Sequence, residues 1–520
     1  MNVDLTAVGS RFAVIGIEDG GNYETAGNYC IYINEKLFTE KAKSVNYVGS
    51  LRPDTEYSVR IEGDESTSLN FRTSAEYVTL DVRKFGAKGD GIHDDTIFIQ
   101  AAVMACPEGG RVFIPEGTYK ITSLFLKSHI SIEIGEGAVL SADTERYSYP
   151  ILPGMIKSYD EKGEYNLGTW EGNPLQMFSS VITGIDVCDV TIYGKGSING
   201  NASYENWWHD EKVMKGAFRP RLLFLERCRD ISVYGIHLEN SPSWTVHPYF
   251  SRSIRLCAVS INNPRVSPNT DGIDVESCCG VEILGVRFTL GDDCIALKSG
   301  KIYMGRKYRT PCENVTIKNC LMENGHGAVT VGSELSAGIK DIKVVNCDFS
   351  DTDRGLRIKT RRGRGKDAVI ENVLFENIFM KGVKVPFAAN AFYFCDPDGR
   401  TDNVQNRAYH TPDETTPYIG ALSFRHIKCV DCHAAAAFFI GLPESMIGRI
   451  EMQDVDISYA SSPESFMPEM LCGVEEMQGR GVIAENVKEL ILEDVTLRGI
   501  KEKPVECTNV DAVKGEVSCR

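Results

Sequence analysis

Residues 281–288 read VEILGVRF, and their pattern of apolar residues at positions 1, 3, 6 and 8 decides the fold. The same spacing occurs at 231–238, 254–261, 315–322, 342–349 and 373–380, with weaker copies near Leu422, Ile450 and Leu490. The copies are roughly 23 to 34 residues apart, with no helical pattern between them. A propeller needs four strands in a longer repeat, and leucine-rich repeats need a regular leucine ladder. The pattern therefore predicts short strands stacked coil on coil, as in a parallel β-helix.

The first 76 residues follow a different pattern. Alternate positions from 51 to 59 hold Leu51, Pro53, Thr55, Tyr57 and Val59, a spacing that predicts one face of a strand. The phrase resembles the L-x-P-x-T-x-Y-x-V signature of fibronectin type III modules, which are small β-sandwiches. The sequence thus predicts an all-β chain with a fibronectin-like β-sandwich over residues 1–76 and a β-helix over residues 77–520.

Charge and composition limit the kinds of molecule that this protein can bind. The formal net charge of −16 argues against nucleic acid, and an anionic polymer would need a local basic site. No uncharged apolar run is long enough to span a membrane, so no membrane partner is expected. The first five residues lack the basic and apolar regions of a signal peptide, which predicts a cytoplasmic protein, or a secreted one if a signal has been removed.

The cysteines do not indicate a metal or disulfide framework. Their number, 17, is odd, and many stand at core positions of the repeat, which predicts buried thiols. Cys429 and Cys432 form a CxxC without the second pair of a zinc ribbon. No cofactor is expected.

Polar, glycine-containing motifs follow the apolar phrase in adjoining coils. They are Asn269-Thr270-Asp271, Gly291-Asp292-Asp293, Gly325-His326-Gly327 and Arg357-Ile358-Lys359. Asp271 and Asp292 are 21 residues apart, about one coil, so stacking predicts a separation near the strand spacing of roughly 4.8 Å. Asp292 and Asp293 can share a site only at a bend, which Gly291 makes easier.

This set of residues fits the hydrolysis of an acidic polysaccharide. Glycoside hydrolysis needs one carboxylic acid to protonate the leaving oxygen and one carboxylate to activate water or attack the sugar. When carboxylates lie close together, their repulsion raises the pKa of one of them, and this protonated group can serve as the acid. Arg357 and Lys359 can hold a sugar carboxylate, and His326 can tune the acid. Arg357 and Lys359 belong to a run of basic residues, and such a run, taken alone, is more typical of a solvent-exposed face. The run is Arg354, Arg357, Lys359, Arg361, Arg362, Arg364 and Lys366.

The motif series resembles that of family 28 glycoside hydrolases, the polygalacturonases. The likeness extends upstream to GKGSING at 194–200, Trp207-Trp208 and NSPSW at 240–244, and spans roughly residues 80 to 500. It implies a right-handed parallel β-helix that hydrolyses α-1,4-galacturonosyl linkages with inversion and without a metal.

The resemblance also implies a role for each matched residue. Asp292 is implied as the general acid, Asp271 and Asp293 as the pair that positions and deprotonates water, and His326 as the support of the acid. The residues implied to bind or order the galacturonate are Arg357, Lys359 and Asn269, and Tyr393 is a weaker candidate near the sugar.

Three alternatives stay open. A pectate lyase shares the fold and uses calcium, which three aspartates could bind. A non-catalytic carbohydrate-binding β-helix is the second, because fold alone does not prove activity. Endo action, or hydrolysis of another part of the pectin backbone, is the third. We expect exo action, because the segments 147–172 and 381–418 exceed ordinary loop length and can close one end of a groove.

Overall fold

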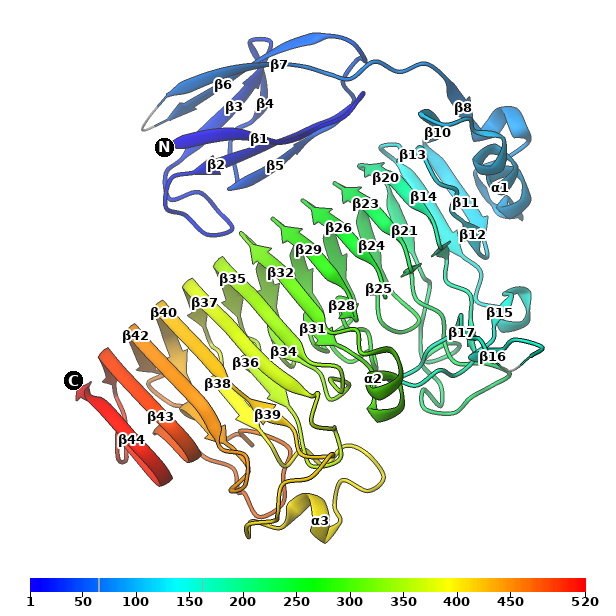
Figure 1. Cartoon of the computed structure of the whole chain (residues 1–520). Coiled ribbons are helices and arrows are strands. Elements are labelled where there is room, and N and C mark those ends of the chain that lie inside the picture. The colour runs from blue at the N-terminus through cyan, green and yellow to red at the C-terminus, as the bar shows by residue number, and fades with distance from the viewer. Residues whose placement is uncertain (64–65, 161) are drawn as a thin grey trace.

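The computed structural model describes residues 1–63, 66–160 and 162–520. It consists of a small antiparallel body at the N-terminus and a long coil of parallel strands that leads to the C-terminus (Figure 1). The coil contains a 33-stranded sheet in which each strand pairs in parallel with the strand one coil further along. The predicted fold class, a parallel β-helix behind a small β-sandwich, is confirmed.

The coil has three stacks of strands. The first stack comprises β8 (Thr79–Asp81), β10 (Gly110–Ile114), β13 (Ile130–Ile134), β20 (Cys188–Gly194), β23 (Arg229–Tyr234), β26 (Arg252–Cys257), β29 (Cys279–Leu284), β32 (Cys312–Lys318), β35 (Ile339–Ser350), β37 (Val369–Lys381), β40 (Ala421–Cys432), β42 (Ile447–Tyr459), β43 (Arg480–Arg498) and β44 (Val505–Cys519). The second comprises β9 (Asp90–Asp94), β11 (Gly117–Ile121), β14 (Ala138–Ala142), β21 (Ser197–Asn199), β24 (His237–Glu239), β27 (Ser260–Asn262), β30 (Arg287–Thr289) and β33 (Leu321–Glu323), and it then merges into the long strand β35. The third comprises β12 (Leu124–Phe125), β19 (Ile182–Ile185), β22 (Leu223–Glu226), β25 (Val246–Tyr249), β28 (Ile273–Glu276), β31 (Ile295–Lys298), β34 (Val329–Val331), β36 (Arg354–Lys359), β38 (Val385–Asn390) and β41 (Ala435–Ile440).

The remaining elements lie on or between the coils. Short pairs are formed by β15 (Ile151–Leu152) with β18 (Met177–Phe178) and by β16 (Met155–Lys157) with β17 (Glu164–Asn166), and β39 (Tyr418–Ile419) precedes β40. The helices are α1 (Thr96–Ala105), α2 (Ile302–Tyr308) and α3 (Asp402–Gln405), with 3-10 turns at Val82–Phe85 and Arg146–Ser148.

Stacking in register explains why the apolar phrase repeats. Val281 pairs with Ile254 on one side and with Val315 on the other, and all three are at most 1% exposed. The coil turns between its first two stacks at residues in the left-handed region, such as Asn346 and Asn377, each with φ of 54°. Asparagine tolerates this conformation better than most residues. The Asn377 amide donates to Asn346 Oδ1 at 3.1 Å, so the corner also stacks from coil to coil.

The N-terminal module contains two antiparallel sheets. One has β1 (Asn2–Val8), β2 (Ala13–Glu18) and β5 (Val45–Val48), and the other has β3 (Tyr29–Ile33), β4 (Lys36–Thr39), β6 (Glu56–Gly63) and β7 (Thr67–Arg72). The strand predicted over 51–59 is wrong in its first half, because Ser50 and Asp54 adopt left-handed φ values of 60° and 48° and turn the chain before β6 begins. We propose residue 76 as the domain boundary, since it lies between β7 and β8.

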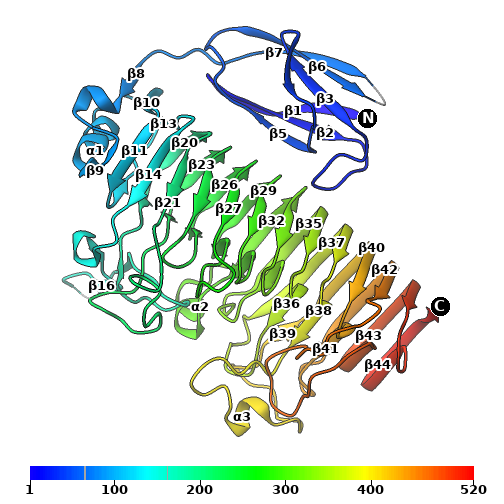
Figure 2. The ribbon, with the colours of Figure 1, turned by 180° about the vertical axis from the view of Figure 1, so that it is seen from behind.

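The module packs against the first stack of the coil. The Phe12 ring lies 4.8 Å from both the Tyr193 and the Tyr234 rings, and Lys318 Nζ pairs with Glu18 at 2.5 Å. From behind, the module lies along strands β20 to β35 (Figure 2). It therefore covers a side of the coil other than the third stack, which carries the polar motifs.

Two further observations concern the described residues. All 17 cysteines are free thiols, and ten of them are buried. Among residues 1–63, 66–160 and 162–520, no helix is long and apolar enough to cross a membrane.

Candidate active site

The polar motifs meet in one cavity of about 830 Å³ over the third stack. Asp271 precedes β28, Asp292 and Asp293 precede β31, and His326 precedes β34, and these three strands pair in parallel one coil apart. The next strand, β36, carries Arg357 and Lys359. The stacking brings together all of the predicted site residues: Asn269, Asp271, Asp292, Asp293, His326, Arg357 and Lys359.

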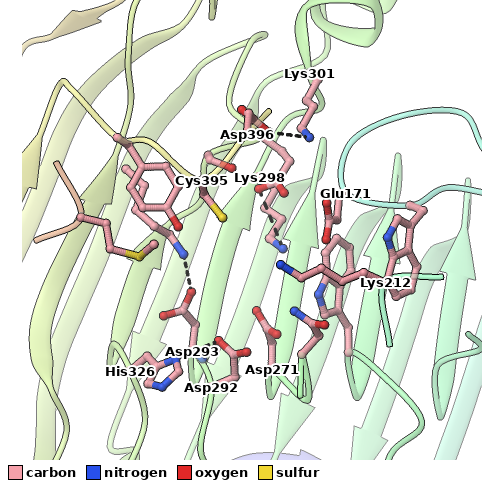
Figure 3. A pocket seen from close by; sticks show the side chains of 18 of the residues that line it. Glu171, Lys212, Asp271, Asp292, Asp293, Lys298, Lys301, His326, Cys395 and Asp396 are labelled. Atoms are coloured by element: carbon pink, nitrogen blue, oxygen red, sulfur yellow. Dashed lines mark hydrogen bonds and ion pairs between the residues drawn. The ribbon is translucent and has the colours of Figure 1, made fainter. Parts of the chain in front are cut away.

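Asp271, Asp292 and Asp293, here called the aspartate trio, lie side by side on the floor of this cavity (Figure 3). One carboxylate oxygen from each lies within 4.8 Å of the other two. The Asp293 backbone N–H donates to Asp292 Oδ1 at 2.9 Å, which fixes the bend that brings neighbouring residues into one site. Gly291 lets the Arg265 backbone lie against this bend, since a Cβ on residue 291 would lie 1.7 Å from the Arg265 carbonyl oxygen.

Basic groups surround the trio on one side. Lys359 Nζ lies 2.7 Å from Asp293 Oδ2, and Arg357 Nη1 lies 3.6 Å from Asp293 Oδ1. His326 Nδ1 lies 3.5 Å from Asp292 Oδ1. The predicted site residue Asn269 has a different contact, because its Oδ1 accepts a hydrogen bond from Arg219 at 2.8 Å.

These contacts separate the pKa values of the trio. Burial and the neighbouring Asp292 raise the pKa of Asp271 well above its ordinary value. Burial also opposes ionisation of Asp293, but Lys359 and Arg357 outweigh it and hold the pKa of Asp293 below its ordinary value. The contact with His326 likewise outweighs burial and lowers the pKa of Asp292, while it raises the pKa of His326. The trio thus combines carboxylates that favour ionisation with one that favours protonation, as acid–base chemistry requires.

The oxygen ligands of the trio also raise the question of a metal ion. Carboxylate oxygens this close suit a hard cation such as calcium. Here, however, the Lys359 ammonium is already 2.7 Å from Asp293, and His326 faces Asp292. A divalent ion bound by all three carboxylates would meet these two basic groups, so the arrangement fits a proton-transfer site better than a calcium site.

Most basic residues between 354 and 366 form ion pairs with acidic residues of loops, and some of them also line the cavity. Arg354 and Arg357 both pair with Glu469, at 2.9 and 2.7 Å. Arg362 pairs with Glu444 at 2.5 Å, and Arg361 and Arg364 both pair with Asp396. Only Lys366, which pairs with Glu414, fits the solvated face that is typical of a charge run.

Sequence reasoning missed the aromatic floor beside the trio. The Trp170 ring stacks on Phe218 at 4.7 Å, and the fully buried Arg221 lies 4.9 Å from Trp170 and 4.7 Å from Trp244. Next to them, Lys298 Nζ lies 3.4 Å from the Trp244 ring centroid. Trp244 lies in the motif NSPSW, which was a usable signal, whereas Trp170 lies in an insertion without one.

Both long insertions contribute to the cavity. Trp170 and Glu171 come from the first, and Tyr393 and Asp396 from the second. Lys301 connects the two insertions, because its backbone N–H donates to the Gly172 carbonyl at 2.9 Å and its Nζ pairs with Asp396 at 3.0 Å.

Comparison with known proteins agrees with this geometry. The model of glycosyl hydrolases family 28 matches residues 132–465, and that of rhamnogalacturonase A/epimerase, pectate lyase-like proteins matches residues 79–147. A Vitis vinifera protein named "Probable polygalacturonase" is 30% identical over 72% of this chain and 74% of its own length. An endo-polygalacturonase from Pectobacterium parmentieri is 28% identical over 57% of this chain and 72% of its own length.

A solved structure extends the likeness to the whole chain. The family 28 exopolygalacturonase of Yersinia enterocolitica superposes with a TM-score of 0.68 at 18% identity, and the match covers 100% of this chain and 98% of that one. At this identity the superposition supports the fold alone, including the N-terminal module. The match of the family model over residues 132–465, a range that includes all of the predicted site residues, shows that the chain belongs to family 28 of the glycosyl hydrolases.

Proposed function

We propose that this protein is a polygalacturonase that removes galacturonate units from the non-reducing ends of oligogalacturonides. The observation that carries the proposal is the aspartate trio in a cleft whose cations, Arg357 and Lys359, lie next to it. The substrate is itself a polyanion, so it needs local cations in a protein whose net charge is −16. Charge-assisted contacts to a carboxylate are what Arg357 and Lys359 offer.

We assign the roles of general acid to Asp292 and of water activation to Asp271 and Asp293. Asp292 has 21% of its side chain exposed, whereas the Asp293 side chain is 2% exposed, so Asp292 can reach a glycosidic oxygen. Without substrate, the pKa of Asp271 is raised and that of Asp292 is lowered, so a shared proton resides on Asp271. Because the carboxyl groups are coupled, that proton belongs to the pair Asp271 and Asp292. When the sugar is bound, this proton resides on Asp292 and is given to the leaving oxygen.

We expect hydrolysis to invert the anomeric configuration. A water held jointly by Asp271 and Asp293 would attack the sugar from the face opposite the bond that Asp292 protonates. The distance between the carboxyl groups, taken alone, is shorter than inversion usually requires. Oxygens of the trio lie within 4.8 Å of one another, whereas inverting enzymes usually have roughly 6.5 to 9.5 Å between the two carboxyl groups. Proton NMR of the first-formed product decides the matter. A product of retained configuration would mean that a carboxylate of the trio acts as a nucleophile.

Exo action is supported by the two insertions that contribute to the wall of the cavity. Residues of both insertions line it, and Lys301 ties the insertions together through Gly172 and Asp396. A cleft that these insertions close at one end would admit the end of a chain more readily than its middle. An endo enzyme needs a groove open at both ends, so endo action is the alternative to this proposal.

Viscometry tests the exo assignment. We expect the viscosity of polygalacturonate to fall slowly relative to the reducing ends formed, because each cleavage removes only one or two sugars. An endo-acting relative assayed under the same conditions provides the matched reference curve. A rapid collapse of viscosity, with a ladder of mixed oligomers, would show that the cleft is open at both ends.

Calcium-dependent elimination is the other chemistry that this fold can host. A lyase would give unsaturated products that absorb ultraviolet light and would stop when calcium is chelated, whereas a hydrolase gives saturated products and tolerates chelation.

The cytoplasmic location expected from the sequence stays a prediction, which fractionation of the producing cells tests.

A further inference from the structure

Two charged side chains in the cavity form no ion pair with any described residue, and they lie together. Outside the aspartate trio, the charged residues that line the cavity form ion pairs, and the described part of the chain shows two exceptions, Glu171 and Lys212. No ion pair or side-chain hydrogen bond is found for either among the described residues. Both side chains project into the cavity above Asp271 (Figure 3).

The chain just before Lys212 is held by several contacts. Trp207 is fully buried and packs against Tyr149 at 5.7 Å, and the Trp208 indole N–H donates to the Ser241 carbonyl at 3.0 Å. The Arg146 guanidinium lies 4.6 Å from the Trp207 ring and donates to the Asn206 carbonyl. These contacts anchor residues 206–208, while Lys212 itself is exposed.

The position of these two residues relative to the trio defines which sugar they can reach. Asp271 lies at the end of the trio nearer to Glu171 and Lys212, while Lys359 contacts Asp293 at the other end (Figure 3). In the proposed mechanism Asp271 and Asp293 together activate the water that attacks the anomeric carbon. Lys359 and Arg357 already pair with Asp293, so the side next to Asp271 is the one left for the sugar that is attacked. The sugar that owns this carbon is the one on the non-reducing side of the bond that breaks.

We propose that Lys212 and Glu171 form a binding site for the galacturonate on the non-reducing side of the scissile bond. The Lys212 ammonium pairs with the carboxylate of this sugar, and Glu171 accepts hydrogen bonds from its hydroxyl groups. Arg357 and Lys359 then serve the carboxylate on the other side. Each of the two sugars would thus have its own cation, which offsets the repulsion from three aspartates. This inference rests on the proposed hydrolysis of galacturonan.

The test compares digalacturonate with its two analogues in which one carboxylate is reduced to a primary alcohol. We expect Lys212→Met to lower kcat/KM on digalacturonate by about tenfold to a hundredfold, the usual worth of one hydrogen-bonded contact to a charged group. On the analogue that lacks the non-reducing carboxylate, the same variant should match the wild type. On the analogue that lacks the other carboxylate, the full loss should remain.

Matched variants separate this effect from a structural one. Lys212→Arg keeps the charge and should restore most of the activity. Lys215 belongs to the same segment, but it pairs with Asp210 at 3.1 Å and does not line the cavity. The Lys215→Met variant should therefore behave as wild type. Glu171→Ala should lower the rate on all three substrates, because the hydroxyl groups are common to them.

The outcomes are distinguishable from a failure of the proposed function. If Lys212→Met loses equally on all three substrates, or loses nothing on digalacturonate, Lys212 does not bind the non-reducing carboxylate. Unchanged rates for Glu171→Ala would remove Glu171 from the site. If the wild-type enzyme hydrolyses neither digalacturonate nor longer oligogalacturonides, the proposed function itself is wrong.

Discussion

The Asp292→Asn variant is expected to lose about a hundredfold to ten-thousandfold in turnover, the usual range for a general acid. The amide cannot give a proton to the leaving oxygen, but it has nearly the same shape as the acid. Folding and binding of oligogalacturonides should therefore change little. Near-wild-type turnover in this variant would show that Asp292 is not the acid.

An activated substrate distinguishes the acid from the groups that position water. An aryl galacturonide with an acidic phenol needs little protonation of its leaving group, so Asp292→Asn should recover much of its activity on it. Asp271→Asn should not recover, because water activation is still required. Since the pKa of Asp271 is raised in the free site, this comparison also shows which of the two carboxyl groups supplies the proton. The opposite pattern of recovery would exchange the two roles.

Removal of Glu469 should destabilise the protein by about 3 to 5 kcal/mol, the range for one partner of a buried ion pair. Its carboxylate is fully buried and pairs with Arg354 and Arg357, both only 6% exposed, so Glu469→Ala leaves two buried guanidinium groups beside each other. Urea unfolding at neutral pH measures the change as a lower midpoint. Glu414→Ala is the matched control, because its pair with Lys366 is exposed and is worth about 0 to 1 kcal/mol.

The contribution of Glu469 should also depend on pH. Burial opposes its ionisation, but Arg357 and Arg354 outweigh burial and hold the pKa of Glu469 below its ordinary value. A carboxyl group with a lowered pKa in the folded state stabilises the fold above its unfolded pKa, and this stabilisation is lost as the pH falls through the folded pKa. The difference between wild type and Glu469→Gln should therefore shrink in acid. A difference that grows in acid would contradict the ionised pair.

The fold and the floor of the site could be predicted from the sequence because both repeat with the coil. Val281, Asp271 and Asp292 each occupy a set position in a coil, so spacing along the chain converts directly into neighbours in space. The strand predicted over 51–59 failed because alternation says nothing about the left-handed turns at Ser50 and Asp54.

The walls of the cavity could not be predicted in the same way. Glu469 contacts Arg357 across 112 residues of sequence, and Lys301 meets Asp396 across 95. These contacts depend on how irregular loops fold back over the coil, which no periodic pattern encodes. For the same reason the basic run could not be divided in advance into residues that line the cavity and residues that hold loops.

The most direct test of the central claim is to follow the products from hexagalacturonate labelled at its reducing end. An enzyme that hydrolyses from the non-reducing end should first give unlabelled, saturated mono- or digalacturonate and a labelled chain shortened by the same length, with or without a calcium chelator. Labelled fragments of every size at the earliest times would contradict exo action, and unsaturated products that disappear on chelation would contradict hydrolysis itself.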